Sequence, residues 1–242
     1  MIRVGVVGAA GRMGSEACRA VEADPELELV ARVEHGDSLE ELRDSGAEVA
    51  VELTTPDSVK ENVRFCLTHG IHCVIGATGL TQADLEDVRA WCRDGGVNAF
   101  VAPNFALGAV LMMSFAASAA PHFDTAEIVE RHHERKVDAP SGTALRTARL
   151  MNDARDGRAW TALPEAADAS RGRDEDGVRI HSLRLPGSVA HQEVVLGAAG
   201  ETLTIRHDST DRKSFMPGVL LAVKKVSHLD GLVVGLEHLL GL

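Results

Sequence analysis

The chain of 242 residues contains no tyrosine and only two tryptophans, and aromatic residues make up 3% of it. It therefore lacks the aromatic platforms on which proteins stack nucleic acid bases. Positive charge is also scarce, because 25 Lys and Arg residues face 36 Asp and Glu residues, and the formal net charge is -11. Such a surface repels phosphates, so we expect no nucleic acid partner.

The four cysteines, Cys18, Cys66, Cys73 and Cys92, form no C-x-x-C pair, and no histidine lies near them at a spacing typical of zinc sites. We expect reduced structural thiols and no metal. No apolar run is long enough to span a bilayer, and a strand is predicted from the second residue with no signal peptide before it. We therefore expect a cytoplasmic protein without a membrane partner.

The first hundred residues alternate between short apolar runs and segments with helical spacing of their apolar residues. This alternation is typical of an α/β fold with a doubly wound parallel sheet. The predicted strands cover residues 2–7, 27–33, 49–53, 72–75 and 98–102. The predicted helices cover residues 12–23, 38–45, 58–68 and 81–92, with Ser38 and Thr81 as helix caps.

The pattern changes near residue 106. Helices are predicted at 107–120 and 143–154, strands at 127–131, 178–185, 189–196 and 203–207, and a long polar loop at 156–176. Strands in close succession predict an antiparallel or mixed sheet in an α+β domain. A helical run at 219–227 and the tail at 232–240 then return to the first domain. We predict one domain from residues 1–106 and 216–242, interrupted by a second from residues 107–215.

The first predicted strand and helix are joined by the turn Gly8-Ala9-Ala10-Gly11-Arg12-Met13-Gly14. Such a turn suits a dinucleotide, because backbone N–H groups and the helix dipole stabilise its pyrophosphate. Glu34 ends the second predicted strand, where a carboxylate accepts hydrogen bonds from ribose hydroxyls, although a solvated loop glutamate is the simpler alternative for this residue alone. The 2′-phosphate of NADP would need a cation near Glu34. The neighbouring His35 is only a partial cation at neutral pH, and Arg12 in the turn could also reach a phosphate.

A second motif concentrates proton-exchanging and anion-binding groups within residues 131–143. His132, His133 and Lys136 follow a predicted strand, and imidazole and ammonium groups can transfer protons. Ser141 is a good helix cap, and the helix start at Gly142 and Thr143 offers N–H groups to a carboxylate. A solvated basic loop followed by an ordinary cap is the alternative. It does not explain why these groups occur together.

The run from Glu130 to Ala144, E-x-H-H-x-x-K-x-D-A-P-S-G-T-A, resembles the signature of the 4-hydroxy-tetrahydrodipicolinate reductase (dihydrodipicolinate reductase) family. The glycine turn and the segments 76–79 and 102–105 resemble that family's other motifs in the same order. The resemblance implies a Rossmann-like domain with an inserted substrate and tetramerisation domain. It also implies reduction of 4-hydroxy-tetrahydrodipicolinate with NADH or NADPH in diaminopimelate and lysine biosynthesis, by a homotetramer whose substrate is a small cyclic dicarboxylate.

The resemblance also implies roles for individual residues. His132 matches the family's proton donor and acceptor and Lys136 its second proton donor, so these two are the expected catalytic residues. The dicarboxylate is expected at His133, Gly142 and Thr143. The expected cofactor contacts are Gly8, Ala9, Ala10, Gly11, Arg12, Met13, Glu34, Gly76, Ala77, Thr78, Ala102, Pro103, Asn104 and Phe105. The flanking Arg131, Glu134 and Arg135 are expected in a solvated loop.

The chain departs from the family pattern near the expected cofactor. His35 replaces an arginine found in some members, Glu52-Leu53-Thr54 replaces Asp-Phe-Thr, and Gly76-Ala77-Thr78 replaces a turn with two threonines. These changes leave the choice between NADH and NADPH open. Two other functions remain as alternatives: another two-domain NAD(P)-dependent dehydrogenase, of the aspartate or homoserine type, and a catalytically inactive nucleotide-binding sensor. A serine hydrolase would need a G-x-S-x-G elbow, which Ser141 lacks.

Overall fold

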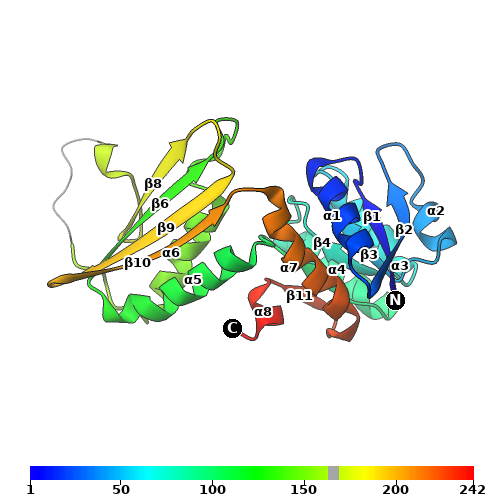
Figure 1. The fold of residues 1–242 in the computed structure, drawn as a ribbon. Helices are drawn as coiled ribbons and strands as arrows, with labels where there is room; N and C mark the ends of the chain where they lie inside the picture. The colour runs from blue at the N-terminus through cyan, green and yellow to red at the C-terminus, as the bar shows by residue number, and fades with distance from the viewer. Residues whose placement is uncertain (163–168) are drawn as a thin grey trace. The chain divides into compact units, whose positions relative to one another are not determined.

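The computed structural model describes residues 1–162 and 169–242. The chain forms two compact units (Figure 1). The first contains Met1–Leu107 and Phe215–Leu242, so both ends of the chain contribute to it. The second contains Gly108–Ser214.

The first unit is built on a six-stranded parallel sheet with the order β11-β5-β4-β3-β1-β2. Its strands are β1 (Ile2–Val7), β2 (Leu27–Val33), β3 (Val49–Glu52), β4 (His72–Ile75), β5 (Ala99–Val101) and β11 (Leu232–Val234). All four residues of β3 are buried, as expected for a central strand with both faces covered. The predicted Rossmann-like sheet is therefore confirmed, and the carboxyl ends of its strands lie at one edge.

Helices cover both faces of this sheet, α1 and α7 on one face and α3 and α4 on the other (Figure 1). The helices of the first unit are α1 (Arg12–Ala23), α2 (Glu40–Asp44), α3 (Val59–Thr68), α4 (Gln82–Gly95), α7 (Met216–Lys225) and α8 (Glu237–Leu240). In α1 the buried residues Gly14, Ala17, Cys18 and Val21 follow helical spacing and form the stripe that packs on the sheet. In α4 Thr81 forms a capping box with Asp84.

The junction between β1 and α1 depends on two glycines. Gly8 has a φ of +84°, and a Cβ there would lie 2.9 Å from the carbonyl oxygen of Leu53. A Cβ on Gly14 would lie 2.0 Å from the carbonyl oxygen of Gly8, so only glycine lets α1 approach the turn this closely. The predicted glycine turn is therefore present, and its shape depends on close backbone contacts at Gly8 and Gly14.

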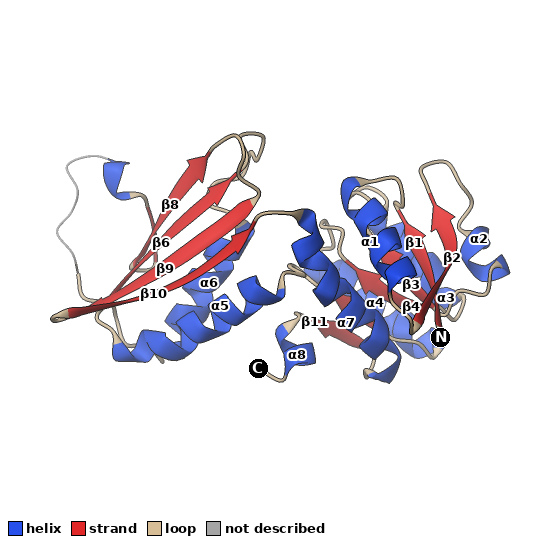
Figure 2. Cartoon of the chain, viewed as in Figure 1, coloured by secondary structure: helices blue, strands red, loops and turns tan. Residues whose placement is uncertain are grey.

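The second unit contains a mixed five-stranded sheet with the order β10-β9-β6-β8-β7. Only the β6–β8 pair is parallel. The strands are β6 (Thr125–His132), β7 (Arg173–Glu175), β8 (Val178–Arg184), β9 (Ala190–Ala198) and β10 (Glu201–Ser209). Helices α5 (Leu107–Ala119) and α6 (Gly142–Ala154) lie along one face of the sheet (Figure 2). Ala126, Ile128 and Glu130 of β6 are buried on that face, and the alternate residues point to the other.

Most predicted elements are confirmed within one to three residues, and three segments differ from the prediction. The helix expected at 38–45 is only Glu40–Asp44, and Ser38 accepts a hydrogen bond from the Glu40 N–H at 3.3 Å without being the N-cap. The loop expected at 156–176 contains the short strand β7, and its residues 163–168 lie outside the described residues. The strand expected at 127–131 extends through His132. Arg131 therefore lies in β6 and not in a solvated loop.

Within the described ranges, no helix has the length and apolar character needed to cross a membrane.

Gly14→Ala should lower the free energy of unfolding by about 1–3 kcal/mol, the usual cost of inserting a methyl group where no space exists. Chemical denaturation measures this change. Gly142→Ala is the matched control, since a Cβ at Gly142 would meet no atom within 4 Å and this variant should unfold like the wild type. Equal stability of the two variants would contradict the packing argument.

Candidate functional site

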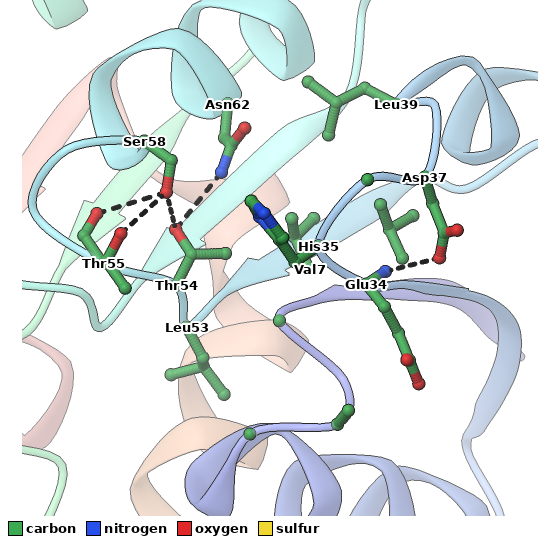
Figure 3. Close-up of a pocket in the computed structure, with 15 residues that line it drawn as sticks. Val7, Glu34, His35, Asp37, Leu39, Leu53, Thr54, Thr55, Ser58 and Asn62 are labelled. Carbon is green, nitrogen blue, oxygen red and sulfur yellow. Dashed lines mark hydrogen bonds between the residues drawn. The ribbon is translucent and has the colours of Figure 1, made fainter.

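The glycine turn opens into a cavity of about 600 Å³ in the first unit (Figure 3). Of the expected cofactor residues, Gly8, Ala10, Gly11 and Glu34 line it. The remaining lining residues are Val7, Val33, His35, Gly36, Asp37, Leu39, Leu53, Thr54, Thr55, Ser58 and Asn62. A cavity of this size beside a glycine turn and a helix start fits the adenosine and phosphate part of a dinucleotide.

The end of β2 contributes two carboxylates to this cavity. Glu34 and Asp37 both line it, and the Glu34 N–H donates to Oδ2 of Asp37 at 2.8 Å, which closes the turn between them. His35 is the neighbouring titratable residue. None of the described residues that line the cavity is a lysine or an arginine. The two carboxylates of Glu34 and Asp37 therefore give this end of the cavity a negative character.

A second polar group lines the opposite wall, and sequence reasoning missed it. Ser58 Oγ donates to Thr54 Oγ1 at 3.0 Å, and Asn62 Nδ2 donates to the same oxygen at 3.2 Å (Figure 3). These residues follow the carboxyl end of β3. The available signal was the position of Glu52-Leu53-Thr54 at the sheet edge where α/β proteins bind ligands.

The buried side chain of Glu52 fixes Thr54 and Asn62 of this wall by hydrogen bonds. It is fully buried, and its Oε1 accepts hydrogen bonds from the Thr54 N–H at 3.2 Å, from the Thr54 hydroxyl and from Asn62 Nδ2 at 3.1 Å. Burial raises the pKa of Glu52, and the hydrogen bonds from Thr54 and Asn62 only partly oppose this rise. Its Oε2 is buried and finds no hydrogen-bond partner among the described residues. A carboxyl group in this position favours its neutral form.

The other expected cofactor residues lie at the same sheet edge or just inside it. Ala9 is buried, and Arg12 and Met13 begin α1. Gly76 and Ala77 follow β4 and donate their N–H groups to the Glu52 carbonyl at 2.9 and 3.3 Å. A Cβ on Gly76 would lie 2.7 Å from Leu53 and from Phe105, so Gly76 lets the segments after β3, β4 and β5 meet.

The remaining expected cofactor residues are Ala102, Pro103 and Asn104, which follow β5 and precede Phe105, and Thr78, which follows Ala77. Ala102 is buried, and its N–H donates to the Ile75 carbonyl at 3.0 Å. Pro103 and Thr78 are exposed, and Asn104 Oδ1 accepts a hydrogen bond from the Ala106 N–H at 2.9 Å. The residues 76–78 and 102–105 do not line the cavity itself.

In the second unit, the residues of the histidine motif surround one buried carboxylate. Glu130 Oε2 lies 2.5 Å from Nδ1 of His132, the last residue of β6. Arg184, at the end of β8, donates to both oxygens of Glu130 at 2.9 and 3.0 Å. The Ser141 N–H donates to Glu130 Oε1 at 3.2 Å, and the Ser141 hydroxyl in turn caps α6 by accepting from the Ala144 N–H. Glu130 thus links β6, β8 and the start of α6.

The charge on Glu130 is stabilised despite its burial. Desolvation acts to raise the pKa, but the hydrogen bonds from His132, Arg184 and Ser182 outweigh it and lower the pKa of Glu130 to about 2. Glu130 is therefore ionised at neutral pH. Sequence reasoning gave no role to Glu130 or to Arg184, which lies 54 positions away from it.

The turn between His132 and α6 carries the other expected residues. Lys136 Nζ contacts both oxygens of Asp138 at 2.8 and 2.7 Å, and this contact lowers the pKa of Asp138. The Lys136 N–H donates to the His133 carbonyl at 3.1 Å. Arg184 donates to the carbonyls of Lys136 and Asp138, so it also holds this turn.

His133, Gly142 and Thr143 lie on either side of that turn. His133 Nδ1 is buried without a hydrogen-bond partner among the described residues, and burial followed by the nearby Arg135 lowers the pKa of its ring. Gly142 begins α6, so the N-terminal end of the helix, where the helix dipole favours an anion, lies at this turn. Glu134 and Arg135 are exposed, as expected. The structure brings together His132, Lys136 and the start of α6, in a form suited to proton transfer beside an anion.

Comparison with known proteins gives consistent results for both units. The family model described as the N-terminus of dihydrodipicolinate reductase matches residues 2–105, and the model for its C-terminus matches residues 108–240. The chain is 54% identical to the 4-hydroxy-tetrahydrodipicolinate reductase of Streptomyces coelicolor and 55% identical to that of Streptomyces griseus. Each match covers 100% of this chain and 98% of the relative.

The fold is similar to solved structures as well. A dihydrodipicolinate reductase of a Paenisporosarcina species with dipicolinate bound superposes with a TM-score of 0.87 at 39% identity, over 98% of this chain and 99% of the other. A probable dehydrogenase of Thermotoga maritima superposes with a TM-score of 0.63 at 12% identity, over 98% of this chain and 92% of the other, which shows likeness of fold alone.

Glu52→Gln should change how stability depends on pH. Because the pKa of Glu52 is raised in the folded state, the folded chain keeps a proton that the unfolded chain releases above its ordinary pKa of 4.5. Wild-type stability should therefore fall as the pH rises from about 4.5 through the raised pKa. The variant should lose this part of the slope. Urea titrations between pH 4 and pH 9 measure it, and exposed Glu61→Gln is the control that should keep the wild-type slope. A wild-type slope in Glu52→Gln would contradict the prediction.

Proposed function

The chain belongs to the dihydrodipicolinate reductase family, and from this premise we propose how its residues carry out the NAD(P)H-dependent reduction of 4-hydroxy-tetrahydrodipicolinate to tetrahydrodipicolinate. This reaction is a step of diaminopimelate and lysine biosynthesis. The observation that carries the proposal is the buried carboxylate of Glu130, which bonds to His132 and to the start of α6. Arg184 bonds both to this carboxylate and to the turn that carries Lys136.

The cofactor binds in the first unit, where it supplies a hydride once bound. In the turn Gly8–Met13 the N–H groups of Gly8, Ala9 and Gly11 donate to backbone carbonyls and fix its shape. The N-terminus of α1, with Arg12 at its first position, then faces the pyrophosphate. Glu34 accepts hydrogen bonds from the adenosine ribose. The segments 76–78 and 102–105 hold the nicotinamide half, because they lie at the same edge of the sheet. The residues present fit the group, since the glycine turn and the carboxylate of Glu34 line one cavity.

The substrate binds in the second unit through its carboxylates. Nδ1 of the His133 ring is buried without a hydrogen-bond partner among the described residues, and α6 begins at Gly142 and Thr143 with the positive end of its dipole. Charge-assisted hydrogen bonds of this kind contribute about 1.5–3 kcal/mol each and favour a dicarboxylate over a neutral ring. The Paenisporosarcina relative, with dipicolinate bound, supports this choice of ligand.

The proton comes from His132, with Lys136 as the second donor. His132 is only partly enclosed, so its ring can face a ligand while Nδ1 stays on Glu130. Lys136 is held by Asp138, which keeps its ammonium group beside the turn.

Another two-domain dehydrogenase is the alternative function, but the solved dehydrogenase structures that would support it share only the fold with this chain. An inactive sensor would not need the linked His132, Glu130 and Arg184.

A homotetramer and a cytoplasmic location complete the proposal, and both rest on the sequence and its resemblance. The face of the second sheet opposite α5 and α6 supports a contact between subunits. It carries Val129, Val195 and Leu183, and Leu183 is 40% exposed. These apolar side chains lie among charged ones such as Glu127 and Arg131, and protein–protein interfaces commonly combine apolar and polar groups in this way.

NADH should be preferred over NADPH. A 2′-phosphate near Glu34 would face two carboxylates without a lysine or arginine in the cavity lining, and one such repulsion of about 1 kcal/mol corresponds to roughly a fivefold loss. Steady-state assays with the product of dihydrodipicolinate synthase measure kcat/KM for each cofactor. The double variant Asp37→Asn with His35→Arg should reverse the preference. Equal values for both cofactors in the wild type would contradict the prediction.

His132→Ala should lower kcat by about 10²–10⁴-fold, the usual contribution of a positioned proton donor. NADH binding, followed by protein fluorescence quenching, should remain at the wild-type level, because His132 lies outside the cavity of the first unit. His181→Ala is the control, since His181 bonds to Glu127 on the opposite face of the same sheet. Unchanged turnover in His132→Ala would exclude His132 as the proton donor.

A further inference from the structure

Both oxygens of Glu130 are fully engaged inside the protein. Its side chain is 0% exposed, and its hydrogen-bond donors come from β6, β8 and the residue that caps α6. A carboxylate without contact to water depends entirely on such donors. Glu130 is therefore fixed in position by three elements, and His132 is bonded to a fixed group.

The chemistry of this contact determines which ring nitrogen carries hydrogen. An ionised carboxylate can only accept hydrogen bonds, so the hydrogen in the 2.5 Å contact must belong to Nδ1 of His132. In the neutral ring the lone pair is then on Nε2, and in the protonated ring Nε2 carries the hydrogen that can leave. The same arrangement orients histidines that ligate metals or act as bases.

We propose that Glu130, held by Arg184, is a positioning residue that keeps hydrogen on Nδ1 of His132 and so presents Nε2 as the nitrogen that delivers the proton to the substrate. This inference rests on the proposed function, because it assigns His132 to proton transfer. Glu130 itself does not touch the reacting atoms. Its carboxylate stabilises the protonated ring, which is the form that acts as an acid.

Arg184 gives the carboxylate its fixed geometry. It donates to both oxygens in the two-pronged arrangement that suits a guanidinium and a carboxylate, and its other donors bond to the carbonyls of Lys136 and Asp138. One side chain thus holds both Glu130 and the turn that carries Lys136. This explains why a residue of β8 belongs to a site that is otherwise contiguous in the sequence.

The charged and polar groups near the His132 ring come from β6, β8, the start of α6 and the turn between them. On β6 the group is Glu130, on β8 it is Arg184, and α6 approaches with the backbone N–H of Ser141. The turn contributes His133 and the Lys136–Asp138 ion pair, with Arg212 near His133. Among these, Glu130 alone is in direct contact with the ring and negatively charged, so its removal should dominate any change.

The kinetic test compares Glu130→Gln with the wild type over a range of pH. An acid is active below the pH at which it loses its proton, so kcat of the wild type should decline as the pH rises. Glu130→Gln removes the negative charge that faces Nδ1 of His132, so the midpoint of this decline should move to lower pH. Glu130→Asp, which keeps the charge but shortens the side chain, should recover part of the shift.

Glu127→Gln is the matched control. Glu127 lies in β6 like Glu130, but it points to the opposite face of the sheet, where it bonds to His181 and Arg171. It should leave the midpoint unchanged. A Glu130→Gln enzyme that loses activity equally at every pH, with the wild-type midpoint, would overturn the inference and leave Glu130 a structural residue. If the wild type does not reduce 4-hydroxy-tetrahydrodipicolinate, the proposed function fails instead.

A spectroscopic measurement tests the inference without any variant of Glu130. In wild-type protein labelled with ¹⁵N-histidine, NMR distinguishes the two ring nitrogens, and His132→Ala assigns the signal. We expect hydrogen on Nδ1 of neutral His132. Hydrogen on Nε2 of the neutral ring would overturn the inference, even if Glu130→Gln does not fold and whatever the activity of the enzyme.

Discussion

The second unit depends on keeping one ionised carboxylate in a site without water. Breaking a buried ion pair by removing one partner usually costs about 3–5 kcal/mol, because the remaining charge stays uncompensated. Glu130 is therefore not independent of its surroundings: Arg184, His132 and the Ser141 N–H must all be in place for the charge to be tolerated. The end of β6, the end of β8 and the start of α6 are consequently set against one another by a single group.

The first unit contains a second buried carboxyl group, that of Glu52, whose pKa is shifted in the opposite direction. Among the described residues, the Glu52 side chain receives hydrogen bonds from the neutral donors Thr54 and Asn62 alone, whereas Glu130 receives them from a guanidinium and an imidazole. This difference in donor charge explains why burial raises the pKa of Glu52 while that of Glu130 falls to about 2. Glu52 organises a polar wall through Thr54 and Asn62 beside a cavity that already contains Glu34 and Asp37.

The sequence predicts the fold and much of the site because the relevant signals are local. Strand and helix periods, the glycine turn and the run 130–144 each lie within a few residues, so strands, helices and the neighbourhood of His132 follow from them. Arg184 could not be found this way, since its contact with Glu130 spans 54 positions and arises only when β6 and β8 pair in register. The polar wall at Thr54, Ser58 and Asn62 was missed for a related reason, because serine, threonine and asparagine there are also ordinary turn residues.

The short spacing of Glu130 and His132 has a physical reason. Side chains two residues apart in a strand lie on the same face, so both point towards the helices while Arg131 between them points away. In the ladder His132 is opposite Arg184, and the guanidinium reaches diagonally to Glu130, one residue pair further along the same face. A carboxylate, an imidazole and a guanidinium are thereby placed on one sheet face without any loop. The three groups that hold one another rigidly come from paired strands, whereas His133 and Lys136 come from the turn that follows β6.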